Sequence, residues 1–334
     1  MFSCYVLVMR YKSYCIQIIV AVLLILPSIN LADELGSEFR IWLEQLRSEA
    51  LNKGISKRTL ELVYADIEAP LTKVIDNDRS QPEFSQTFNK YLTNRINKQF
   101  IKTGKKMLGR YPTWLSKVER KYSVQKRFLV ALWGIESSYG KYLGTYPVIQ
   151  ALATLAYDQR RSKYFRQELF EALHLIDDGI IPYERMQGSW AGAMGQCQFM
   201  PSSFRRYAVD ADNSGSINIW ASVPDVLGSI GNYLAQSGWK NDQTWGREIK
   251  LPKGFDYSLA GLEKRRPLSE WQSMGVRRIN NRDLPTRNLM ASLVLPEGPT
   301  GPSYLVYDNF RVLLSWNRST FFALTVGILS DQFK

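Results

Sequence analysis

Histidine and cysteine are scarce in this sequence. Its 334 residues include one histidine, His174, and three cysteines, of which Cys197 is the one outside the N-terminal segment. One thiol cannot form an intramolecular disulfide, and a zinc site assembled from His and Cys needs more of these ligands than the chain has. His174 lies in a helical pattern, FEALHLIDDG, which disfavours Ser-His-Asp or Cys-His catalysis. Any catalysis is therefore expected to depend on carboxylates.

Long apolar runs are also absent, apart from a short one near the N-terminus. Residues 15–26 are mostly apolar, follow a basic start and precede Pro27. This layout predicts a secretory signal peptide over residues 1–32, since the run is short for a membrane span. An uncleaved N-terminal anchor is the alternative. Neither N-terminal cysteine directly follows the run, so we expect a soluble periplasmic protein and not a lipoprotein.

Acidic residues are too few to balance the basic ones. The chain has 43 Lys and Arg against 31 Asp and Glu, which gives a net charge of +12. A basic protein is attracted to anionic surfaces such as membranes, nucleic acid or acidic cell-wall polymer. Export and the lack of a Lys/Arg run argue against a nucleic-acid partner. Aromatic residues form 13% of the chain, which suits core packing first and carbohydrate stacking second.

The hydrophobic pattern predicts a mainly α protein. Apolar residues recur at helical spacing over most of the chain, whereas Pro and Gly punctuate short extended runs between Arg247 and Val306. The terminal run FFALTVGILSDQF is again helical and is expected to pack back onto the central helices. The predicted regions are an N-terminal α domain (33–112), a helical catalytic core (113–245), a small β-containing domain (246–306) and a returning C-terminal segment (307–334).

A carboxylate occupies an unusual position in the stretch WGIESSYG, residues 133–140. At helical spacing Glu136 shares a face with Phe128, Leu129 and Leu132, in a helix that Ser123 is predicted to cap. Apolar neighbours disfavour the ionised carboxyl and raise its pKa, and a carboxylic acid that is protonated near neutral pH can donate a proton. Spacing alone leaves two interpretations open, a catalytic acid and a member of a structural ion pair.

The wider sequence pattern favours the catalytic interpretation. The segments GIESSYGKYLG, LATLAYDQRR, GSWAGAMGQCQFMPSSFRRYAVD, GNYLAQSGW and NFRVLLSWNRSTFFAL occur in this order. With these motifs the sequence resembles the lytic murein transglycosylases of the B type (glycoside hydrolase family 103), over about residues 36–333. The resemblance implies a lysozyme-like helical core with an N-terminal helical domain and a small β-containing insertion.

The resemblance also implies roles for individual residues. Glu136 would be the catalytic acid and base. Ser137 would hydrogen-bond the carboxyl group or cap nearby backbone. The other implied substrate-binding residues are Arg160, Arg161, Gln198, Asn232, Tyr233 and Asn317. Residue type alone favours structural roles for these, namely buried amides bonded to backbone, a core tyrosine and a solvated pair of arginines.

The mechanism that the resemblance implies depends on a missing group. Besides Glu136 the matched motifs contain two acids, Asp158 and Asp210, and the resemblance gives neither of them the role of the second carboxylate that ordinary glycosidases need. In the family's solution, the enzyme cleaves the MurNAc-β-1,4-GlcNAc bond, the muramic acetamido group assists, and a 1,6-anhydroMurNAc end forms. No cofactor is required. The expected partner is the glycan strand of peptidoglycan, other cell-wall enzymes are further candidates, and we expect a monomer.

Two alternatives to this function are kept. A lysozyme-type muramidase would hydrolyse the same bond, and Asp177, Asp178 or Glu184 would have to reach the cleft as the base that activates water. A non-catalytic cell-wall-binding protein would not need Glu136 as an acid. The mass of the released muropeptides and the effect of Glu136→Gln discriminate among the three.

The segment AVDADNSGSINIW, residues 208–220, has the spacing of a calcium loop. Asp210 occupies position 1, with Gly at the sharp turn of position 6, but position 12 is Ala221 where a bidentate Glu is expected. Asp225 would have to close a longer loop. The alternatives are a weak structural Ca²⁺ site and an Asx-rich turn without metal. The candidate ligands are Asp210, Asp212, Ser214, Ser216 and Asp225.

Overall fold

The structure is a computed structural model, and it describes residues 31–80 and 86–334, with the side chains of 31–35 left out. Over these residues the chain is mainly helical, with a five-stranded sheet and a separate two-stranded one, which confirms the predicted fold class. The predicted signal peptide, 1–32, lies almost entirely outside the described residues. Within them, no single helix is long and apolar enough to cross a membrane; the bent pair Asp308–Trp316 and Thr320–Asp331 meets the criteria of length and composition together, at an angle of 120°.

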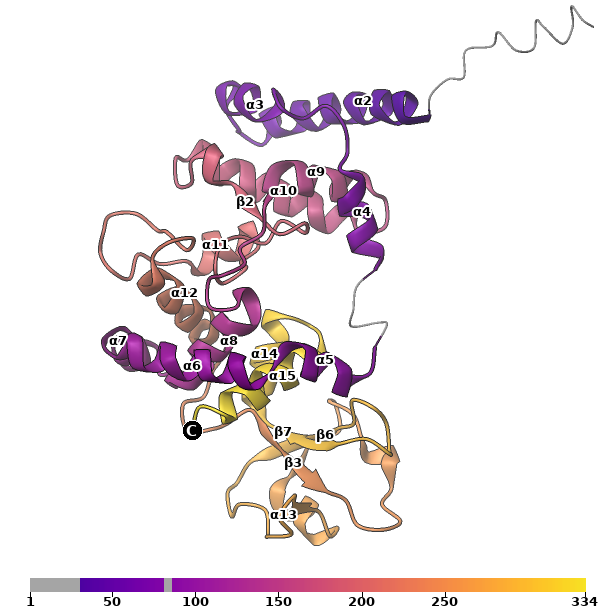
Figure 1. Cartoon of the computed structure of the whole chain (residues 1–334). Helices are drawn as coiled ribbons and strands as arrows, with labels where there is room; N and C mark the ends of the chain where they lie inside the picture. The colour runs from indigo at the N-terminus through magenta and orange to yellow at the C-terminus, as the bar shows by residue number, and fades with distance from the viewer. Residues whose placement is uncertain (1–30, 81–85) are drawn as a thin grey trace, which may run out of the picture.

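Helices α2, α3 and α4 cover a helical hairpin formed much later in the chain (Figure 1). Helix α3 begins after Ser56, whose side chain accepts a hydrogen bond from the Thr59 backbone and caps the helix. Phe39 packs between Trp42 and Tyr157 and is fully buried. The helices concerned are α2 (Leu31–Asn52), α3 (Lys57–Tyr64), α4 (Thr72–Arg79), α9 (Val148–Tyr157) and α10 (Ser162–Asp177).

The next helices surround α8, which lies at the centre of the molecule. Helix α8 packs against α6, α7, α12 and α15, and α5 packs against α15. The predicted N-terminal region 33–112 is helical, but it packs as two groups that share one continuous core with the rest of the helices. The bounds are α5 (Phe88–Arg95), α6 (Lys98–Arg110), α7 (Pro112–Tyr122), α8 (Lys126–Ser137), α12 (Val223–Gln236), α14 (Asp308–Trp316) and α15 (Thr320–Asp331).

Ser123 does not cap α8, contrary to the sequence prediction. It ends α7 in a left-handed conformation (φ 57°), and its backbone N–H donates to the Glu119 carbonyl. The N-cap of α8 is Gln125, whose side chain forms no capping bond and instead accepts from the Trp239 indole. Helix α8 ends at Ser137, before the left-handed Ser138 and Tyr139. The local pattern could not separate the two roles, because serine is suited to both helix ends.

Several short elements lie between α8 and α12 along the chain, in addition to α9 and α10. Strand β1 (Tyr146–Pro147) pairs with β2 (Gln187–Gly188) in antiparallel register. A 3-10 turn, η2 (Tyr183–Arg185), precedes β2, and helix α11 (Pro201–Tyr207) follows it. Gly144 approaches so close to Gly188 that a Cβ would lie 2.0 Å from its carbonyl oxygen, so glycine is required there.

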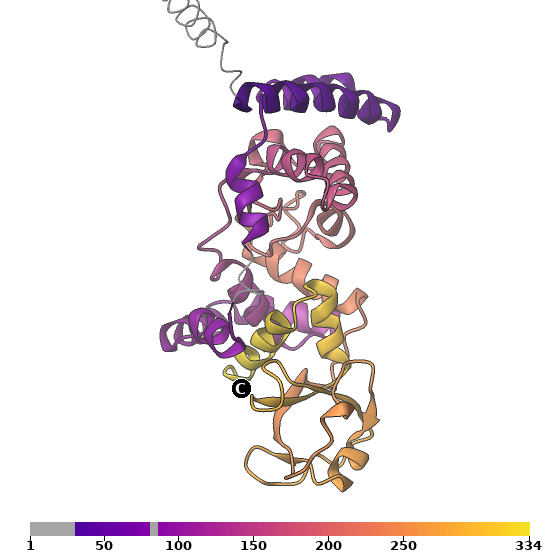
Figure 2. The ribbon, with the colours of Figure 1, turned by 90° about the vertical axis from the view of Figure 1, so that its right-hand side faces the viewer.

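The predicted β-containing insertion forms a five-stranded antiparallel sheet with the order β4-β6-β7-β3-β5. It has its own hydrophobic core around the buried Trp271. In Figure 2 the insertion lies at the opposite end of the elongated molecule from α2 and α3. Its elements are β3 (Gly246–Lys250), η3 (Tyr257–Leu259), β4 (Arg266–Pro267), α13 (Leu268–Ser273), β5 (Arg277–Arg278), β6 (Met290–Val294) and β7 (Ser303–Val306).

Candidate active site

Glu136 lies in the last turn of α8, where the helix leaves the core. Phe128, Leu129 and Leu132 on the same helix are fully buried, as the spacing predicts. Glu136 itself is partly exposed, so its carboxyl reaches the surface of the core. The Trp316 indole Nε1 donates a hydrogen bond to Glu136 Oε1 over 2.5 Å. The site therefore joins the end of α8 to the end of α14, 180 residues further along the chain.

Burial is the main influence on the Glu136 carboxyl. It raises the pKa from 4.5 to about 7, because a carboxylate that loses its water is disfavoured. The hydrogen bond from Trp316 and the charge of Arg95 act in the opposite direction and keep the pKa from rising further. Glu136 forms no ion pair within the described residues. The carboxyl is thus divided between its acid and its anion near neutral pH.

A tight loop, Met194–Phe199, lies beside this carboxyl. Met194 and Phe199 form two backbone hydrogen bonds, and Gly195 and Gln198 adopt left-handed conformations between them. The Cys197 thiol is fully buried, and burial followed by the charge of Glu136 raises its pKa, so the thiol stays neutral. The ring of Phe199, at the end of the loop, contacts the Trp316 ring that bonds Glu136, which places the loop next to the site.

Gln198 is held in this loop by its own amide. Its Nε2 donates to the carbonyl oxygens of Leu143 and Gly195, at 3.2 and 2.8 Å. Within the described residues Gln198 Oε1 has no hydrogen-bond partner, and the residue is partly exposed. The side chain is therefore fixed with an acceptor atom available.

The neighbouring Gln196 anchors the loop to two other elements. Its Oε1 accepts from the Trp133 indole of α8 at 2.8 Å, and its Nε2 donates to the Trp220 carbonyl at 2.9 Å. Its backbone N–H donates to the Ile219 carbonyl. Gln196 thereby ties the loop to α8, one turn before Glu136, and to the aspartate-rich segment. The sequence prediction missed this residue.

Four aromatic rings form one side of the site. Trp316 contacts Phe199 and Tyr233, with centroid separations of 5.2 and 4.6 Å, and Tyr233 contacts Tyr207 at 4.4 Å. The Tyr233 hydroxyl donates to the Ser315 carbonyl, and burial raises its pKa to about 12. Trp316 and Tyr207 remain partly exposed. Partly exposed rings beside a carboxyl provide a surface on which a sugar can stack.

The amides predicted to bind substrate have structural partners. Asn232 Nδ2 donates to the Tyr207 carbonyl, and its Oδ1 accepts from Gln236. Asn317 is exposed directly after Trp316, and its Oδ1 accepts from the Ser319 backbone. Asn232 therefore supports Tyr207, whereas Asn317 lies at the surface beside the indole that contacts Glu136.

Ser137 is 1% exposed, so its side chain is not available to a substrate. Its hydroxyl donates to the Trp133 carbonyl and accepts from the Gly140 backbone, and it caps the end of α8. Of the two roles predicted for Ser137, the structure supports backbone capping. The assignment of Ser137 to the substrate-binding set is corrected accordingly.

Arg160 and Arg161 lie at the start of α10, where both pair with Asp78 of α4. Asp78 is 5% exposed, and Arg160 also donates to its carbonyl oxygen. Neither arginine forms a hydrogen bond or ion pair with Glu136. Their visible role is to fasten α4 against the α9–α10 hairpin, and about half of the Arg160 side chain remains exposed.

Within the part of the chain that the structure describes, none of the three acids proposed as the base of a hydrolytic mechanism contacts Glu136. Asp177 accepts hydrogen bonds from Ser56 and Thr59 and holds α3, and the Ser56 bond lowers its pKa. Asp178 pairs with Arg205, and Glu184 lies exposed in η2. No second carboxylate contributes to the pKa shift of Glu136 among the described residues.

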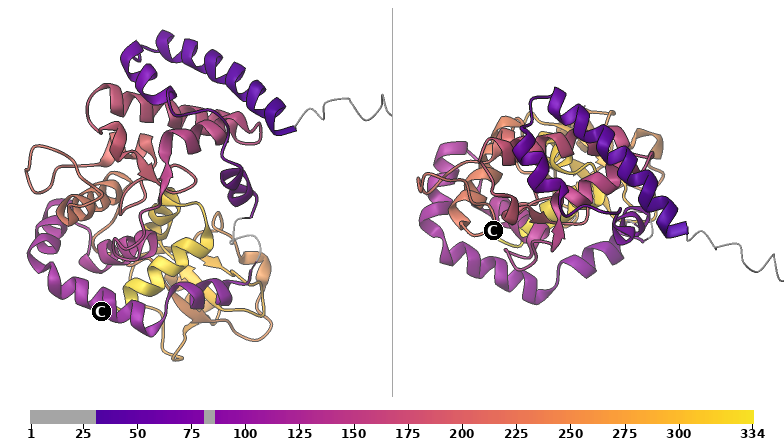
Figure 3. Two further views of the ribbon diagram at one scale, coloured as in Figure 1. Left: turned by 45° about the horizontal axis from the view of Figure 1, so that its top comes forward. Right: turned by 90° about the horizontal axis from the view of Figure 1, so that it is seen from above.

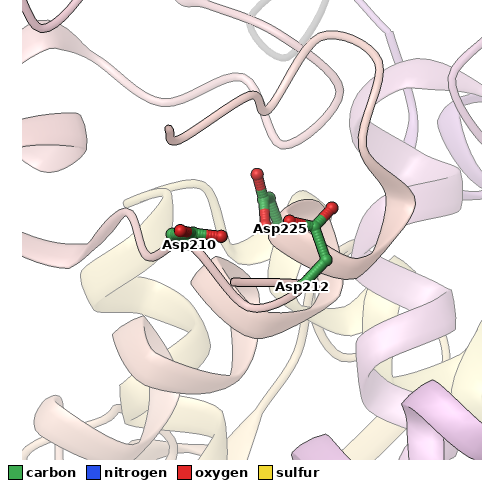
Figure 4. Close-up of side chains that lie close together, drawn as sticks. All are labelled: Asp210, Asp212 and Asp225. Carbon is green, nitrogen blue, oxygen red and sulfur yellow. The ribbon is translucent and has the colours of Figure 1, made fainter. Parts of the chain in front are cut away.

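The predicted calcium loop brings three aspartates together (Figure 4). Asp210, Asp212 and Asp225 each offer a carboxylate oxygen, and these oxygens lie within 4.8 Å of one another. Asp225 is fully buried in the first turn of α12, where it accepts from the backbone of Ala211 and Asn218. Ser222 also donates to Asp212 and lowers its pKa.

Trp316 and Arg95, like Gln196, were not among the site residues predicted from the sequence. Both act on Glu136, but one is 180 residues away and the other precedes the matched cleft motifs. Trp316 stands next to Asn317 in the WNRS motif, which was the one available signal. A contact over such a separation depends on how α14 packs against α8, and local spacing does not encode it.

A lysozyme-like helical core with a lone, partly buried carboxyl beside an aromatic wall defines a class of glycan-cleaving enzymes. The chain belongs to the transglycosylase SLT domain family, whose model matches residues 38–331. It is a lytic transglycosylase, an enzyme that acts on peptidoglycan. The resemblance inferred from the motifs is thereby confirmed.

Individual relatives agree with this assignment. The chain is 33% identical to membrane-bound lytic murein transglycosylase B of Escherichia coli over 280 residues, which cover 80% of this chain and 72% of that protein. SltB3 from Pseudomonas aeruginosa, whose crystal structure in complex with NAG-anhNAM-pentapeptide is known, is 44% identical in sequence to this chain. The two structures superpose with a TM-score of 0.84, and the match covers 88% of this chain and 79% of SltB3. The Escherichia coli lytic transglycosylase Slt35, in its complex with calcium, is 28% identical in sequence. Its TM-score is 0.74, and the match covers 87% of this chain and 92% of Slt35.

Proposed function

We propose that the protein cleaves the MurNAc-β-1,4-GlcNAc bond of peptidoglycan and leaves a 1,6-anhydroMurNAc end. The observation that carries the proposal is a single carboxyl, Glu136, with a pKa of about 7 and no second carboxylate acting on it within the described residues. One group that is half protonated near neutral pH is suited to act first as an acid and then as a base. The anhydro sugar bound to SltB3 supports this product.

The first step transfers the Glu136 proton to the glycosidic oxygen. The Trp316 indole has a donor and no acceptor, so Glu136 Oε1 is the acceptor in their hydrogen bond. Because a carbonyl oxygen is a better acceptor than the hydroxyl oxygen of a carboxylic acid, this bond favours the transferable proton on Oε2. The C1–O4 bond breaks, the GlcNAc leaves with a hydroxyl group, and the 2-acetamido group of MurNAc stabilises the positive charge at C1.

In the second step the same carboxyl acts as a base. Glu136, now a carboxylate stabilised by the Trp316 hydrogen bond and the Arg95 charge, takes the proton of the 6-hydroxyl. The O6 atom bonds to C1, and Glu136 returns to its acid form without consuming water. Gln198 Oε1 and the exposed amide of Asn317 would orient the acetamido and flanking groups.

Muropeptide mass analysis tests the proposal. Purified peptidoglycan is digested with the wild type, with Glu136→Gln and with Glu184→Gln, an exposed acid outside the site. We expect anhydro-muropeptides from the wild type and from Glu184→Gln, and a loss of roughly 10²- to 10⁴-fold for Glu136→Gln. Products one water heavier would instead indicate a muramidase, and an active Glu136→Gln would exclude the acid–base role.

We also propose that the aspartate-rich loop binds a structural Ca²⁺. Three carboxylates within 4.8 Å provide hard oxygen ligands, which calcium prefers, and they repel one another without a cation. Asp210, Asp212 and Asp225 would hold the ion, and it would fix the loop that Gln196 links to the active site. The calcium complex of Slt35 supports this proposal.

Unfolding temperature in the presence of each cation tests the calcium proposal. We expect Ca²⁺ to raise the melting temperature of the wild type more than Mg²⁺ does, because Mg²⁺ demands stricter geometry. Asp212→Asn should abolish the effect, whereas Asp256→Asn, an exposed aspartate in the β insertion, should preserve it. A calcium site would be contradicted if Ca²⁺ and Mg²⁺ raised the melting temperature equally, or if Ca²⁺ raised that of Asp212→Asn as much as that of the wild type.

A periplasmic location is likewise proposed, from the signal-like pattern of residues 1–32 and the membrane-bound relative of Escherichia coli. Fractionation of cells that express the full chain tests it, with immunoblotting for the mature size. A shorter species in the periplasmic fraction supports cleavage and export. A full-length species in the membrane fraction would indicate the uncleaved anchor.

A further inference from the structure

Two consecutive helices, α6 and α7, carry a concentration of positive charge outside the active site. Residues 98–122 contain eight lysines and arginines and one acid, Glu119, so their balance of +7 exceeds half of the chain's +12. All eight cations are exposed. We call this surface the basic face; its residues are Lys98, Lys102, Lys105, Lys106, Arg110, Lys117, Arg120 and Lys121.

The helical spacing places these charges on one side. In α6 the lysines at 98, 102 and 105 recur every three or four residues, while Gly104 and Met107 are buried against the core. In α7 Lys117 and Lys121 are one turn apart, while Leu115 and Val118 point inward. Figure 3 shows the two helices along the outer edge of the molecule in both views.

The basic face is not neutralised by the protein itself. Glu119 is engaged by Lys126, whose Nζ lies 3.6 Å away, and none of the eight cations forms an ion pair within the described residues. By contrast, helices α2 and α3 balance their charges through the pairs Arg47–Glu44, Lys53–Glu49 and Lys57–Glu61. Like charges at i,i+4, such as Lys98–Lys102 and Lys102–Lys106, destabilise a helix. A densely anionic partner would remove that repulsion.

We propose that the basic face docks the enzyme onto the anionic headgroups of a phospholipid bilayer. Clusters of four to eight cations on an amphipathic helix are typical of anionic-lipid recognition. No large apolar side chain of α6 or α7 is fully exposed, so the basic face does not insert into the acyl region. Its partly exposed rings, Tyr111, Trp114 and Tyr122, lie beneath Arg110, Lys117 and Lys121, which present cations and not bare rings to a partner. Mobile lipid headgroups can match any spacing of cations, which suits charges arranged along two helices. Docking would hold the active site at a fixed side of the membrane surface.

Vesicle co-sedimentation of the full chain tests the proposal. The probes are vesicles of phosphatidylcholine alone, which measure the contribution of the apolar N-terminus, and vesicles that also contain phosphatidylglycerol. The test variant is Lys102→Glu, Lys105→Glu, Lys106→Glu. The matched control is Arg58→Glu, Lys73→Glu, Lys253→Glu, which changes three exposed cations on α3, α4 and the β insertion by the same total charge.

The wild type and the control are expected to bind phosphatidylglycerol vesicles, more weakly as salt rises. The test variant should bind on the order of a hundredfold more weakly, with unchanged turnover of soluble glycan strands. Equal loss in both variants would overturn the proposal, since net charge alone would then suffice. Loss of binding to purified peptidoglycan sacculi with vesicle binding intact would also overturn it and assign the face to the cell-wall polymer. Vesicle binding is measured without any catalytic turnover, so a negative result would contradict the docking proposal and leave the proposed reaction untouched.

Discussion

At the residue scale, the site is organised around one hydrogen bond. Trp316 donates to Glu136 Oε1, and the same ring packs against Phe199 and Tyr233. Burial raises the pKa of the carboxyl to about 7, and the indole opposes that rise by stabilising the anion. In the proposed mechanism Trp316 is a positioning residue: its hydrogen bond orients the carboxyl, favours the proton on Oε2 and lowers the pKa.

Replacing Trp316 by Phe should shift the pH profile. In the wild type, kcat/KM should fall as pH rises above about 7, because the protonated carboxyl acts first. Without the indole donor the carboxylate is less stable, so the pKa rises and the falling limb moves to higher pH. Activity at the optimum should drop roughly ten- to hundredfold, the value of one hydrogen bond to a charged group.

A pH profile of kcat/KM on soluble glycan strands measures this effect. Trp316→Tyr, which restores a donor on an aromatic ring, should return the limb toward its original pH. If Trp316→Phe lowers activity without moving the limb, Trp316 has a packing role and no effect on the acid.

At this scale the sequence predicted the environment of Glu136 in part. The apolar spacing around Glu136 predicted a raised pKa, and Phe128, Leu129 and Leu132 are buried as expected. Ser137 was placed among the substrate-binding residues, but it caps the helix end. Two adjacent residues in a helix point about 100° apart, so their roles depend on which side of α8 faces the core.

At the element scale, close packing between helices positions α8. Helix α15 packs on α8, and its Gly327 lies against the buried Trp245 ring. The Trp245 indole donates to Asp331, which also pairs with Arg127 of α8. The C-terminal helix is therefore held by an apolar contact and an ion pair that converge on the active-site helix.

Gly327→Ala should destabilise the protein by roughly 1–3 kcal/mol, the usual cost of overpacking a core. The added Cβ would lie 2.3 Å from Trp245 Cδ2, and that ring is 1% exposed and cannot move aside. Gly109→Ala in α6 is the control, because a Cβ there meets nothing within 4 Å. The control should be neutral or slightly stabilising through helix propensity. Urea unfolding measures both, and an equally stable Gly327→Ala would show that the helices can separate.

At the scale of the whole molecule, two hydrophobic cores divide the structure. One runs from α2 through the catalytic helices to α15, and the other belongs to the β insertion. Phe39 is fully buried in the first core and Trp271 in the second. The N-terminal helices therefore share their stability with the active site, while the insertion has a core of its own.

Phe39→Ala and Trp271→Ala should show whether the two cores unfold independently. Each substitution should lower the free energy of unfolding by about 3–5 kcal/mol, as expected for the loss of a buried aromatic ring. Trp271→Ala should accelerate amide hydrogen exchange in β6 and β7 and leave α8 protected, whereas Phe39→Ala should accelerate exchange in α8. Exchange that rises equally in both regions for both variants would show that the molecule unfolds as one unit.

The sequence by itself determined the helical class, the β-containing insertion, the family and the residue that carries the proposed chemistry. These depend on local periodicity and on ordered motifs, which a linear chain displays directly. Tertiary structure alone decided that residues 33–112 pack as two groups, that Arg160 and Arg161 hold Asp78, and that Trp316 contacts Glu136. The physical reason is that side-chain partners far apart in sequence are chosen by helix packing, and packing depends on the shape of every surface that meets.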